Sequence, residues 1–523
     1  MRATLSSLFV GTLLLVCSPS RAQAEQRSDS PVMQAELPEG DCQSLPSRLG
    51  AGYVEKIEAS TVEAGEGSPA YCRVTGVVLP SIGFEMRLPI RGWNGKFYQA
   101  GCGGFCGQVL PDANGYSNGI GVAVRRGYAA IVTDSGHTGS SPGDATWAVD
   151  QEAVELFAHR WVPLAYSAGH TIAKKFYGDA PRLSYFSGCS NGGRVALIAA
   201  QRYPRLFNGI ISGCPVLDLT GSGGIFGAWK LQTNRDSTAP VLGSAFNRKL
   251  SFLAEQVRMQ CDARDGRSDG LISQLGCPVD VAAIPGCASA ADGDTSSQCL
   301  TAEEKRVVAQ WFGGPADSSG RQLFGGMPPG SEFYWTIWYL QDPSQAIGTQ
   351  LAEGFTRYLA FSEKDPSYSA ASFDFDADPA RMTASASLLN ATDPDISEFR
   401  DNGGKLLLWH GMADALVVPS QSVDYYQWVL ERMGGPQQVQ SFFRLFLAPG
   451  LGHCWEAPSP TAPEDFDPLT AIEEWVEQGQ APDVLVARSS ARQGDLAVSE
   501  IHYRPYRAGP NVLDGAQFDG PDQ

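Results

Sequence analysis

Gly188-Cys189-Ser190-Asn191-Gly192 is the stretch that decides the fold of this chain. An apolar run, residues 183–186, precedes it, and a run typical of a helix, residues 194–202, follows it. A strand, a tight turn and a helix in this order form a nucleophile elbow, which lifts a serine hydroxyl above the end of a sheet. The pattern predicts that Ser190 is a nucleophile on an α/β fold.

A second Gly-x-Ser-x-Gly sequence, residues 139–143, does not meet these conditions. Pro142 has no N–H, so it cannot provide the oxyanion donor that must follow a nucleophilic Ser141. The flanks of this sequence also lack a change from strand to helix. Ser190 is therefore the candidate nucleophile.

The sequence Gly452-His453-Cys454 provides the partner that a serine nucleophile needs. A base must take the proton of the hydroxyl, and a carboxylate must orient that base. His453 is the candidate base, in a loop after a strand predicted over residues 441–448. Asp414 is the candidate carboxylate, just beyond a strand predicted over residues 406–410. The order Ser, Asp, His along the chain is that of α/β-hydrolases.

Other acidic and imidazole side chains remain as alternatives near these positions. Asp401 and Asp424 are weaker candidates for the carboxylate. His137, which follows a predicted strand, and His410 are candidates to line the substrate site. His410 also has a structural interpretation, in which it holds the turn that carries Asp414.

Acyl transfer needs hydrogen-bond donors for the oxyanion of the tetrahedral intermediate. The N–H of Asn191 is one candidate, because it directly follows the nucleophile. The second donor is expected in the loop after a strand predicted over residues 96–101. There Gly103 or Gly104 lets the backbone approach a substrate closely, although a plain glycine turn is the alternative.

Strands and helices are predicted to alternate along the chain. Apolar, β-branched runs predict strands over residues 96–101, 128–133, 183–187, 209–213, 406–410 and 441–448. Helical patterns cover residues 153–177, 193–207 and 470–478. This alternation is typical of a mainly parallel, doubly wound sheet in an α/β protein.

The alternation breaks between residues 217 and 399, where Gly, Pro, Ser and Asp are frequent. Aromatic residues cluster at 333–339. A segment of this length is too long for a plain loop. We predict a lid domain over residues 217–399, inserted into a catalytic domain formed by residues 25–216 and 400–523.

Residues 1–24 have the pattern of a cleaved signal peptide. Arg2 is basic, residues 5–17 are apolar but too short to span a membrane, and Ala22-Gln23-Ala24 fits a cleavage site. A lipoprotein signal through Cys17 is the weaker interpretation. The predicted location is secreted or periplasmic, without a membrane anchor, because no later run reaches about 18 apolar residues.

The formal net charge of −18 at pH 7 is not offset by a run rich in lysine and arginine. Nucleic acids and anionic membrane surfaces are therefore not expected partners.

The twelve cysteines indicate disulfides in an exported protein. Spacing suggests three local pairs, Cys42–Cys72, Cys261–Cys277 and Cys287–Cys299. A long-range Cys189–Cys454 disulfide would hold its two Cα atoms roughly 4.4–6.8 Å apart, which brings Ser190 and His453 within reach of proton transfer. The pairing of Cys102, Cys106 and Cys214 stays open, and at least one thiol is expected.

An acidic loop closed by two cysteines, residues 261–277, is a candidate calcium site. Ca²⁺ prefers carboxylate and carbonyl oxygens. The candidate ligands are the side chains of Asp262, Asp265 and Asp269 and the carbonyl groups of Arg267 and Leu271. A solvated acidic turn is the alternative, since Asp-Gly is common in turns. Zinc is not expected, because the cysteines are predicted to be oxidised and no histidine pair has ligand spacing.

Together these features resemble the tannase and feruloyl esterase family, which includes mono(2-hydroxyethyl) terephthalate hydrolases. The resemblance extends from about residue 42 to 504. Its marks are Gly-Cys-Ser-Asn-Gly-Gly-Arg at 188–194, Gly-His-Cys at 452–454, Trp-Asn-Gly-Lys-Phe at 93–97 and the acidic loop at 261–277. Many members also carry a cysteine near the C-terminus, which is absent here after Cys454.

The resemblance implies an α/β-hydrolase core with a large lid and a disulfide between the neighbours of the catalytic serine and histidine. It implies the triad Ser190, Asp414 and His453. It also implies a lid calcium held by Asp262, Asp265, Arg267, Asp269 and Leu271.

Arg357, Phe361 and Ser362 are similar in spacing to the lid segment that binds a terephthalate carboxylate in the terephthalate monoester hydrolases. A guanidinium group suits a carboxylate. The alternative is an arginine that forms a surface ion pair on a lid helix.

These expectations combine into an exported serine esterase that acts on small aromatic esters, such as feruloyl, galloyl or terephthaloyl esters, with aromatic side chains of the lid holding the acyl ring. Two other functions stay open. One is a catalytically silent, calcium-stabilised binding module on a hydrolase scaffold, and the other is a lipase for long acyl chains.

Overall fold

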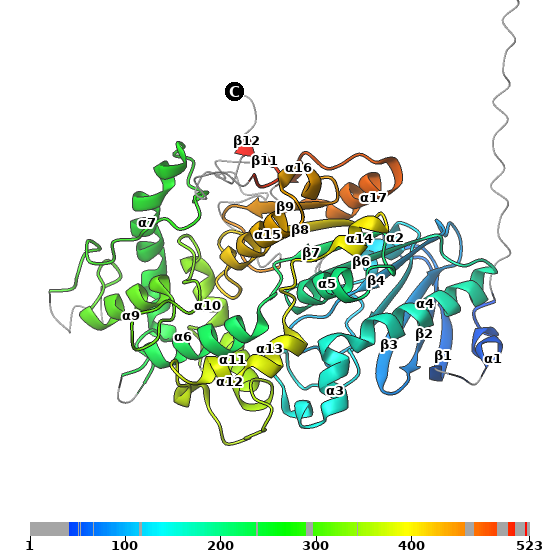
Figure 1. Cartoon of the computed structure of the whole chain (residues 1–523), viewed down its shortest axis with the longest axis horizontal. Coiled ribbons are helices and arrows are strands. Elements are labelled where there is room, and N and C mark those ends of the chain that lie inside the picture. The colour runs from blue at the N-terminus through cyan, green and yellow to red at the C-terminus, as the bar shows by residue number, and fades with distance from the viewer. Residues whose placement is uncertain are drawn as a thin grey trace, which may run out of the picture. The chain divides into compact units, whose positions relative to one another are not determined.

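The computed structural model describes residues 41–507 and 518–519, except residues 51, 53, 66, 114–117, 237–238, 289–295, 343, 455–464 and 489–499 (Figure 1). The predicted signal peptide lies outside the described residues. No helix in the described part of the chain combines the length and the hydropathy that a membrane span requires.

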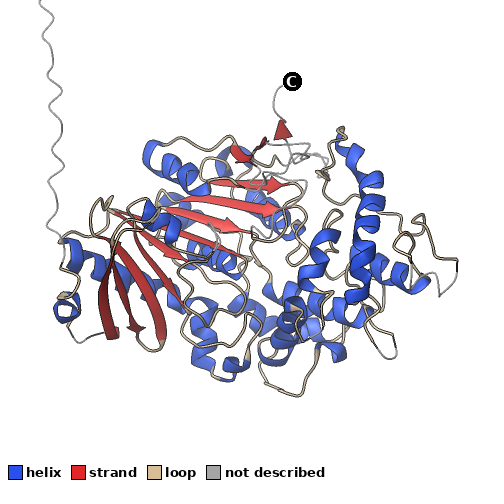
Figure 2. Cartoon of the chain, turned by 180° about the vertical axis from the view of Figure 1, so that it is seen from behind, coloured by secondary structure: helices blue, strands red, loops and turns tan. Residues whose placement is uncertain are grey.

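A nine-stranded mixed sheet forms the centre of the fold (Figure 2). Its strands lie in the order β1 (Val54–Val62), β2 (Tyr71–Val78), β3 (Ile82–Pro89), β5 (Ala129–Thr133), β4 (Lys96–Ala100), β6 (Leu183–Cys189), β7 (Gly209–Gly213), β8 (Lys405–Gly411) and β9 (Phe443–Ala448). The first three strands and the β3–β5 pair are antiparallel. All pairs from β5 to β9 are parallel. The predicted α/β class and mainly parallel sheet are confirmed.

Each central strand is buried on both faces, so its neighbouring residues belong to different hydrophobic cores. In β6, Phe186 packs in the core that includes α4 (Trp161–Tyr177) and α5 (Asn191–Arg202). Tyr185 packs in a second core, with α17 (Pro468–Gln478). Burial on both faces explains the continuous apolar runs that predict these strands.

The six predicted strands all exist, with ends shifted by at most two residues. The predicted helix over residues 153–177 consists of α3 (Gln151–Glu155), a π-helical turn and α4. The sequence did not predict β1, β2 and β3. In β1 most side chains are exposed or half-buried, so this edge strand lacks the apolar run that marks the central strands.

The long crossover from β7 to β8 is largely helical and includes the segment for which a lid is predicted. Its helices are α6 (Gly227–Thr233), α7 (Leu250–Cys261), α9 (Ala302–Gly313), α10 (Trp335–Trp338), α11 (Ile347–Tyr358), α12 (Asp378–Arg381), α13 (Thr383–Leu389) and α14 (Ser397–Asp401). In Figure 1, α6, α7, α9 and α10 gather on one side of the sheet. Trp311 and Trp335 lie at the centre of a separate core here. A lid domain over residues 217–399 stays a prediction.

The remaining elements complete the edges of the fold. They are α1 (Leu45–Leu49), α2 (Gly121–Arg125), α15 (Ser420–Arg432) and α16 (Pro436–Val439), with a small sheet of β10 (Leu485–Arg488), β11 (Glu500–Tyr503) and β12 (Phe518–Asp519).

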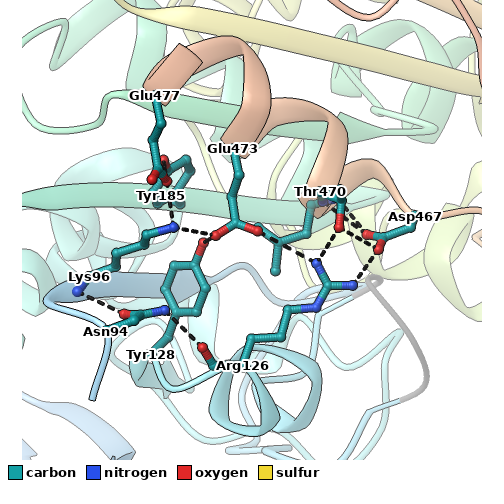
Figure 3. A network of polar contacts seen from close by, with 10 residues as sticks. Asn94, Lys96, Arg126, Tyr128, Tyr185, Asp467, Thr470, Glu473 and Glu477 are labelled. Carbon is teal, nitrogen blue, oxygen red and sulfur yellow. Dashed lines mark hydrogen bonds and ion pairs between the residues drawn. The ribbon is translucent and has the colours of Figure 1, made fainter. Parts of the chain in front are cut away.

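A polar network fixes α17 against the start of the central strands (Figure 3). Lys96, the first residue of β4, forms ion pairs with Glu473 (2.6 Å) and Glu477 (2.5 Å) of α17. The hydroxyl groups of Tyr128 and Tyr185 donate to the same two glutamates. Burial acts to lower the pKa of Lys96, but the two glutamates outweigh it and raise that pKa. The network therefore anchors the sheet at the ends of the strands opposite Ser190.

Candidate active site

Ser190 lies in a tight turn between β6 and α5. Its φ of +63° and ψ of −123° are unusual for a residue with a side chain. Backbone hydrogen bonds hold this conformation, because the N–H of Ser190 donates to the carbonyl of Gly213 at 3.0 Å. A Cβ on Gly188 would lie 2.6 Å from the backbone of Gly192, so the turn has room only for glycine there. This geometry is that of a nucleophile elbow.

Asp414 and His453 lie in loops that follow neighbouring strands, β8 and β9, and the structure brings their side chains together. Oδ2 of Asp414 lies 2.6 Å from Nδ1 of His453, and both residues are buried. Oδ1 of Asp414 accepts from the N–H groups of Leu416 (2.9 Å) and Val417 (2.8 Å). Burial acts to raise the pKa of Asp414, but the charge of His453 and hydrogen bonds from His410 and His453 outweigh it and lower that pKa. The carboxylate is therefore ionised where it orients His453.

Ser190 and His453 line one pocket, together with Trp338 of α10. The cysteines beside them, Cys189 and Cys454, form the expected disulfide with a Cα–Cα distance of 5.8 Å. The structure thus places all three predicted triad residues around one site.

His410 supports Asp414 from behind and is not among the residues that line the two pockets next to Ser190. Its Nε2–H donates to the carbonyl of Val417 at 2.9 Å, and its Nδ1 accepts from the hydroxyl of Ser422 at 2.7 Å. Its Nε2 also lies 3.3 Å from Oδ2 of Asp414. These contacts agree with the structural interpretation of His410.

His137 likewise holds a loop instead of lining these pockets. Its Nε2–H donates to the carbonyl of Phe105 at 2.7 Å, and its ring stacks on Trp147 with a centroid distance of 3.6 Å. Burial lowers the pKa of His137 to about 4, so the imidazole is neutral at pH 7. It fixes the loop after β4, where a second oxyanion donor is expected.

The glycine loop after β4 lies beside Ser190. Gly103 and Gly104 both line the outer pocket with Ser190, and Gly104 lines the inner pocket as well. Gly104 has a φ of +57°, and a Cβ there would lie 2.5 Å from the carbonyl oxygen of Pro142. An oxyanion donor at Gly103 or Gly104 stays a prediction.

The side chain of Asn191 ties this loop to the elbow. Its Nδ2 donates to the carbonyl of Cys102 at 3.2 Å, and its Oδ1 accepts from Nε of Arg194 at 2.8 Å. Cys102 and Cys106 form a disulfide, the pair that the sequence left open. The backbone N–H of Asn191 thereby has a fixed position next to Ser190.

All four predicted disulfides are present, and Cys102–Cys106 is the fifth. Cys214 is buried and keeps its thiol. Its Sγ lies within 4.8 Å of ligand atoms of His410 and Asp414, the one such group of three among the described residues. That group belongs to the support of the triad.

Two pockets meet at Ser190. The inner one is narrow, with a cavity volume of about 50 Å³, and its lining is mainly apolar. Its polar side chains, apart from Ser190 and Asn191, are Ser222, Lys230 and Tyr339. The outer one is wider, with a cavity volume of about 360 Å³, and His453 and Trp338 are among the residues that line it. Inserted residues form much of the lining of the inner pocket, and Trp338 and Tyr339 of the aromatic cluster each line one of the two pockets.

Sequence reasoning missed Lys230. The residue lies in α6 and is 4% exposed. The available signal is a single lysine within an apolar run, Ile-Phe-Gly-Ala-Trp-Lys-Leu at 225–231.

Arg357 lies on α11 but is not among the residues that line either pocket. Its guanidinium donates to the carbonyl of Tyr368 at 2.9 Å and forms an ion pair with Glu353 at 3.3 Å. Of the alternative carboxylates, Asp401 pairs with Arg400 on the surface and Asp424 is exposed. Neither of these lines the two pockets.

The acidic loop at the end of α7 holds its three aspartates in different environments. Asp262 is buried and forms an ion pair with Arg258 at 2.8 Å. Oδ2 of Asp265 is buried and has no hydrogen-bond partner among the described residues. Burial raises the pKa of Asp269, and the charges of Asp265 and Asp262 add to this effect.

These observations fit a cation in the loop, because a carboxylate oxygen without a donor and a carboxylate with a raised pKa are both stabilised by positive charge. The N–H groups of Arg267 and Leu271 donate to Asp265 (2.9 Å) and Asp269 (3.0 Å). The three carboxylates do not gather within 4.8 Å of one another. Calcium binding therefore stays a prediction.

Several known proteins are similar to this chain. The model of the family described as "Tannase and feruloyl esterase" matches residues 67–510. An uncharacterized esterase of Xanthomonas campestris pv. campestris is 31% identical, covering 95% of this chain and 89% of its own length. The mono(2-hydroxyethyl) terephthalate hydrolase of Piscinibacter sakaiensis is 30% identical, over 80% of this chain and 78% of its own. The crystal structure of feruloyl esterase B from Aspergillus oryzae superposes with a TM-score of 0.76 at 26% identity, covering 91% of this chain and 99% of that one.

Proposed function

Because the chain belongs to the tannase and feruloyl esterase family, we propose that it is a serine esterase that cleaves small aromatic carboxylic esters through an acyl-enzyme intermediate. The observation that carries this proposal is the contact of 2.6 Å between Asp414 and His453, in a site that also contains the strained elbow of Ser190. A serine, a histidine and a buried carboxylate in this arrangement are suited to acyl transfer.

In the first half of the reaction, Oγ of Ser190 attacks the ester carbonyl carbon while Nε2 of His453 takes the hydroxyl proton. Asp414 keeps the proton of His453 on Nδ1 and stabilises the imidazolium that forms. The oxyanion accepts hydrogen bonds from the N–H of Asn191 and from a backbone N–H at Gly103 or Gly104.

Collapse of this intermediate breaks the bond to the alcohol oxygen, which receives the proton from His453. In the second half a water molecule attacks the acyl-enzyme, His453 takes its proton, and the acid leaves as Ser190 regains its own.

Two observations support an aromatic acyl group in the substrate: the lining of the inner pocket and the names of the relatives. The inner pocket beside Ser190 is lined mainly by apolar side chains, which suits an aromatic ring. The relatives are named as hydrolases of feruloyl and terephthaloyl esters. Feruloyl, galloyl and terephthaloyl esters are therefore the substrates to test first.

Calcium in the loop of residues 261–277 is proposed as a structural ion. Asp262, Asp265 and Asp269 would hold it with the carbonyl groups of Arg267 and Leu271, and the ion would offset the charge of this acidic loop. The loop lies within the inserted segment and shares no residue with the two pockets at Ser190. The proposed location is secreted or periplasmic, since five disulfides are typical of an oxidising compartment.

The test is hydrolysis by the purified mature protein of methyl ferulate, methyl gallate, mono(2-hydroxyethyl) terephthalate and a long-chain nitrophenyl ester. Turnover of an aromatic ester that is lost in Ser190→Ala is the expected result. A strong preference for the long-chain ester would indicate a lipase instead. If no ester is cleaved above the level of Ser190→Ala, and a fluorophosphonate probe does not label the protein, the silent binding module becomes the better account.

A further inference from the structure

Lys230 lies at the inner pocket in an environment that is unusual for a lysine. The residue is 4% exposed, and it lines the same pocket as Ser190 and Asn191. Its Nζ donates to the hydroxyl of Tyr339 and lies over two aromatic rings, 3.9 Å from the centroid of Phe226 and 4.3 Å from that of Tyr339. No carboxylate of the described chain forms an ion pair with Lys230.

A second buried lysine of the same inserted segment, Lys249, is paired with a carboxylate, as is usual for a buried lysine. Lys249 is 1% exposed, and its Nζ binds both carboxylate oxygens of Glu304, at 2.9 and 2.7 Å. Lys249 lines neither of the pockets at Ser190. Burial of a lysine without a charged partner reduces the stability of the folded protein, because the amine loses its hydration. Lys230, which lacks one but faces the site, is thus the better candidate for a role toward substrate.

On the basis of the proposed function, we propose that Lys230 and Tyr339 bind a phenolic hydroxyl group on the aromatic ring of the acyl group. The substrates of this site are then esters of hydroxylated aromatic acids, and Lys230 and Tyr339 determine that specificity. The phenol donates its hydrogen bond to the amine of Lys230 or shares its proton with it. The hydroxyl of Tyr339, already fixed by Lys230, provides a second polar contact.

The charges around the pocket favour a neutral phenol over a carboxylate at this end. Burial lowers the pKa of Lys230 well below its usual range, although the charge of Asp414 acts to raise it. An amine of lowered pKa is a good acceptor for a phenolic proton. The negative charge of Asp414, close enough to influence Lys230, also disfavours a second carboxylate beside Lys230. The pocket is thereby expected to prefer esters with a hydroxylated acyl group over terephthaloyl esters.

The test compares esters that differ only at the far end of the ring. We would measure kcat and KM for methyl cinnamate against methyl 4-hydroxycinnamate, and for methyl benzoate against methyl 4-hydroxybenzoate and monomethyl terephthalate. In the native protein kcat/KM is expected to be at least about tenfold higher for each hydroxylated ester than for its unsubstituted partner, because a polar site left without its substrate hydroxyl discriminates strongly.

Lys230→Met keeps the length of the side chain but removes its amine. It is expected to reduce the ratio of kcat/KM between the hydroxylated and the unsubstituted ester of each pair to about one, whatever its effect on turnover of the unsubstituted esters. Tyr339→Phe is expected to reduce the ratio in the same direction by a smaller factor. Lys249→Met is the matched control, and its ratios should equal those of the native protein even if its thermal stability falls.

A binding measurement separates this proposal from the hydrolytic function. Methyl 4-hydroxycinnamate and methyl cinnamate would be titrated by calorimetry into Ser190→Ala and into Ser190→Ala combined with Lys230→Met. A tighter Kd for the hydroxylated ester than for methyl cinnamate, lost when Lys230 is replaced, supports the proposal even if the native protein cleaves neither ester. Absence of turnover would count only against the proposed hydrolytic function.

Three outcomes overturn the proposal while leaving the esterase intact. The first is equal binding and turnover of hydroxylated and unsubstituted esters by the native protein. The second is a preference for the hydroxylated esters that survives in both Lys230→Met and Tyr339→Phe. The third is a preference for monomethyl terephthalate that Lys230→Met abolishes, which would show that the amine binds a carboxylate.

Discussion

Oδ2 of Asp414 lies 2.6 Å from Nδ1 of His453, although 39 positions separate the two residues in the chain. The contact exists because β8 and β9 are parallel neighbours, so the loops that follow them leave the sheet side by side. Two further N–H groups and His410 also bind the carboxylate of Asp414. This carboxylate has one fixed orientation, and through it so does the ring of His453.

Asp414→Asn should lower kcat by roughly 10³–10⁴-fold, as expected when the histidine of a triad loses its orienting charge and tautomer. Steady-state hydrolysis of the best aromatic ester checks this expectation. Asp401→Asn and Asp424→Asn are the matched controls, because both carboxylates are exposed, and each should keep kcat within about twofold. A large loss in either control, with normal activity of Asp414→Asn, would reassign the carboxylate.

The Cys189–Cys454 disulfide should matter for activity as well as for stability. Replacement of both cysteines by serine removes the bond that joins the neighbours of Ser190 and His453, and removal of a native disulfide costs about 2–5 kcal/mol. We expect a reduced melting temperature and a loss of kcat/KM of at least about tenfold at a temperature where the variant is folded. Circular dichroism and ester hydrolysis measure the two effects.

The control for this experiment is the double replacement of Cys287 and Cys299, which closes a local loop of the inserted segment. It should reduce the melting temperature with little change in kcat/KM. Equal effects of the two double variants on kcat/KM would mean that the long-range disulfide has no special role in holding the triad.

Removal of calcium by a chelator should lower the melting temperature of the native protein, and added Ca²⁺ should restore it, because ligand binding to the folded state raises stability. Asp265→Asn should abolish this response, since Oδ2 of Asp265 is the buried carboxylate oxygen without a donor. Asp280→Asn, at an exposed turn of the same segment, should respond like the native protein. A melting temperature that is independent of Ca²⁺ and chelator would leave a solvated acidic turn as the description of the loop.

His137 should make the protein less stable in acid. Burial lowers its pKa to about 4 in the folded state, from an unfolded value of about 6.5. Between these two values the unfolded state binds more protons, so stability increases with pH and is lost as the pH falls from about 6.5 to 4. His137→Gln should reduce the slope of the unfolding free energy against pH in this window by up to about 1.4 kcal/mol per pH unit.

Urea unfolding of both proteins at several pH values between 4 and 7 provides this slope. His502→Gln is a suitable control, because His502 is half-exposed and lies outside the hydrolase site. An unchanged slope in His137→Gln would show that the residue titrates alike in both states.

The elbow at Ser190 and the central strands could be predicted from the sequence because their signals are local. A buried parallel strand needs an apolar run on both faces, and a nucleophile elbow needs small residues at fixed spacing, as at Gly188 and Gly192. The edge strand β1 was missed because most of its side chains are exposed or half-buried, which gives a weaker pattern. β3 is largely buried, but Glu85 and Arg87 interrupt its apolar run.

The substrate pocket could not be predicted in the same way, because its wall comes from residues far apart in the chain. Lys230 and Tyr339 are 109 positions apart, and no spacing connects them. Arg357 has the spacing of a carboxylate-binding arginine, but in this fold its guanidinium meets Glu353 one helical turn away. Specificity depends here on tertiary contacts that local sequence does not encode.

The insertion between β7 and β8 also has a mechanical consequence for the triad. Ala413 and Ala415, on either side of Asp414, are buried in the hydrophobic core of the inserted helices. Replacement of this insertion by one from another protein would thus remove packing partners of the loop that carries Asp414. Enzyme engineers who transplant it to alter selectivity should expect misalignment of the general base, unless the graft restores a matching apolar surface against these two alanines.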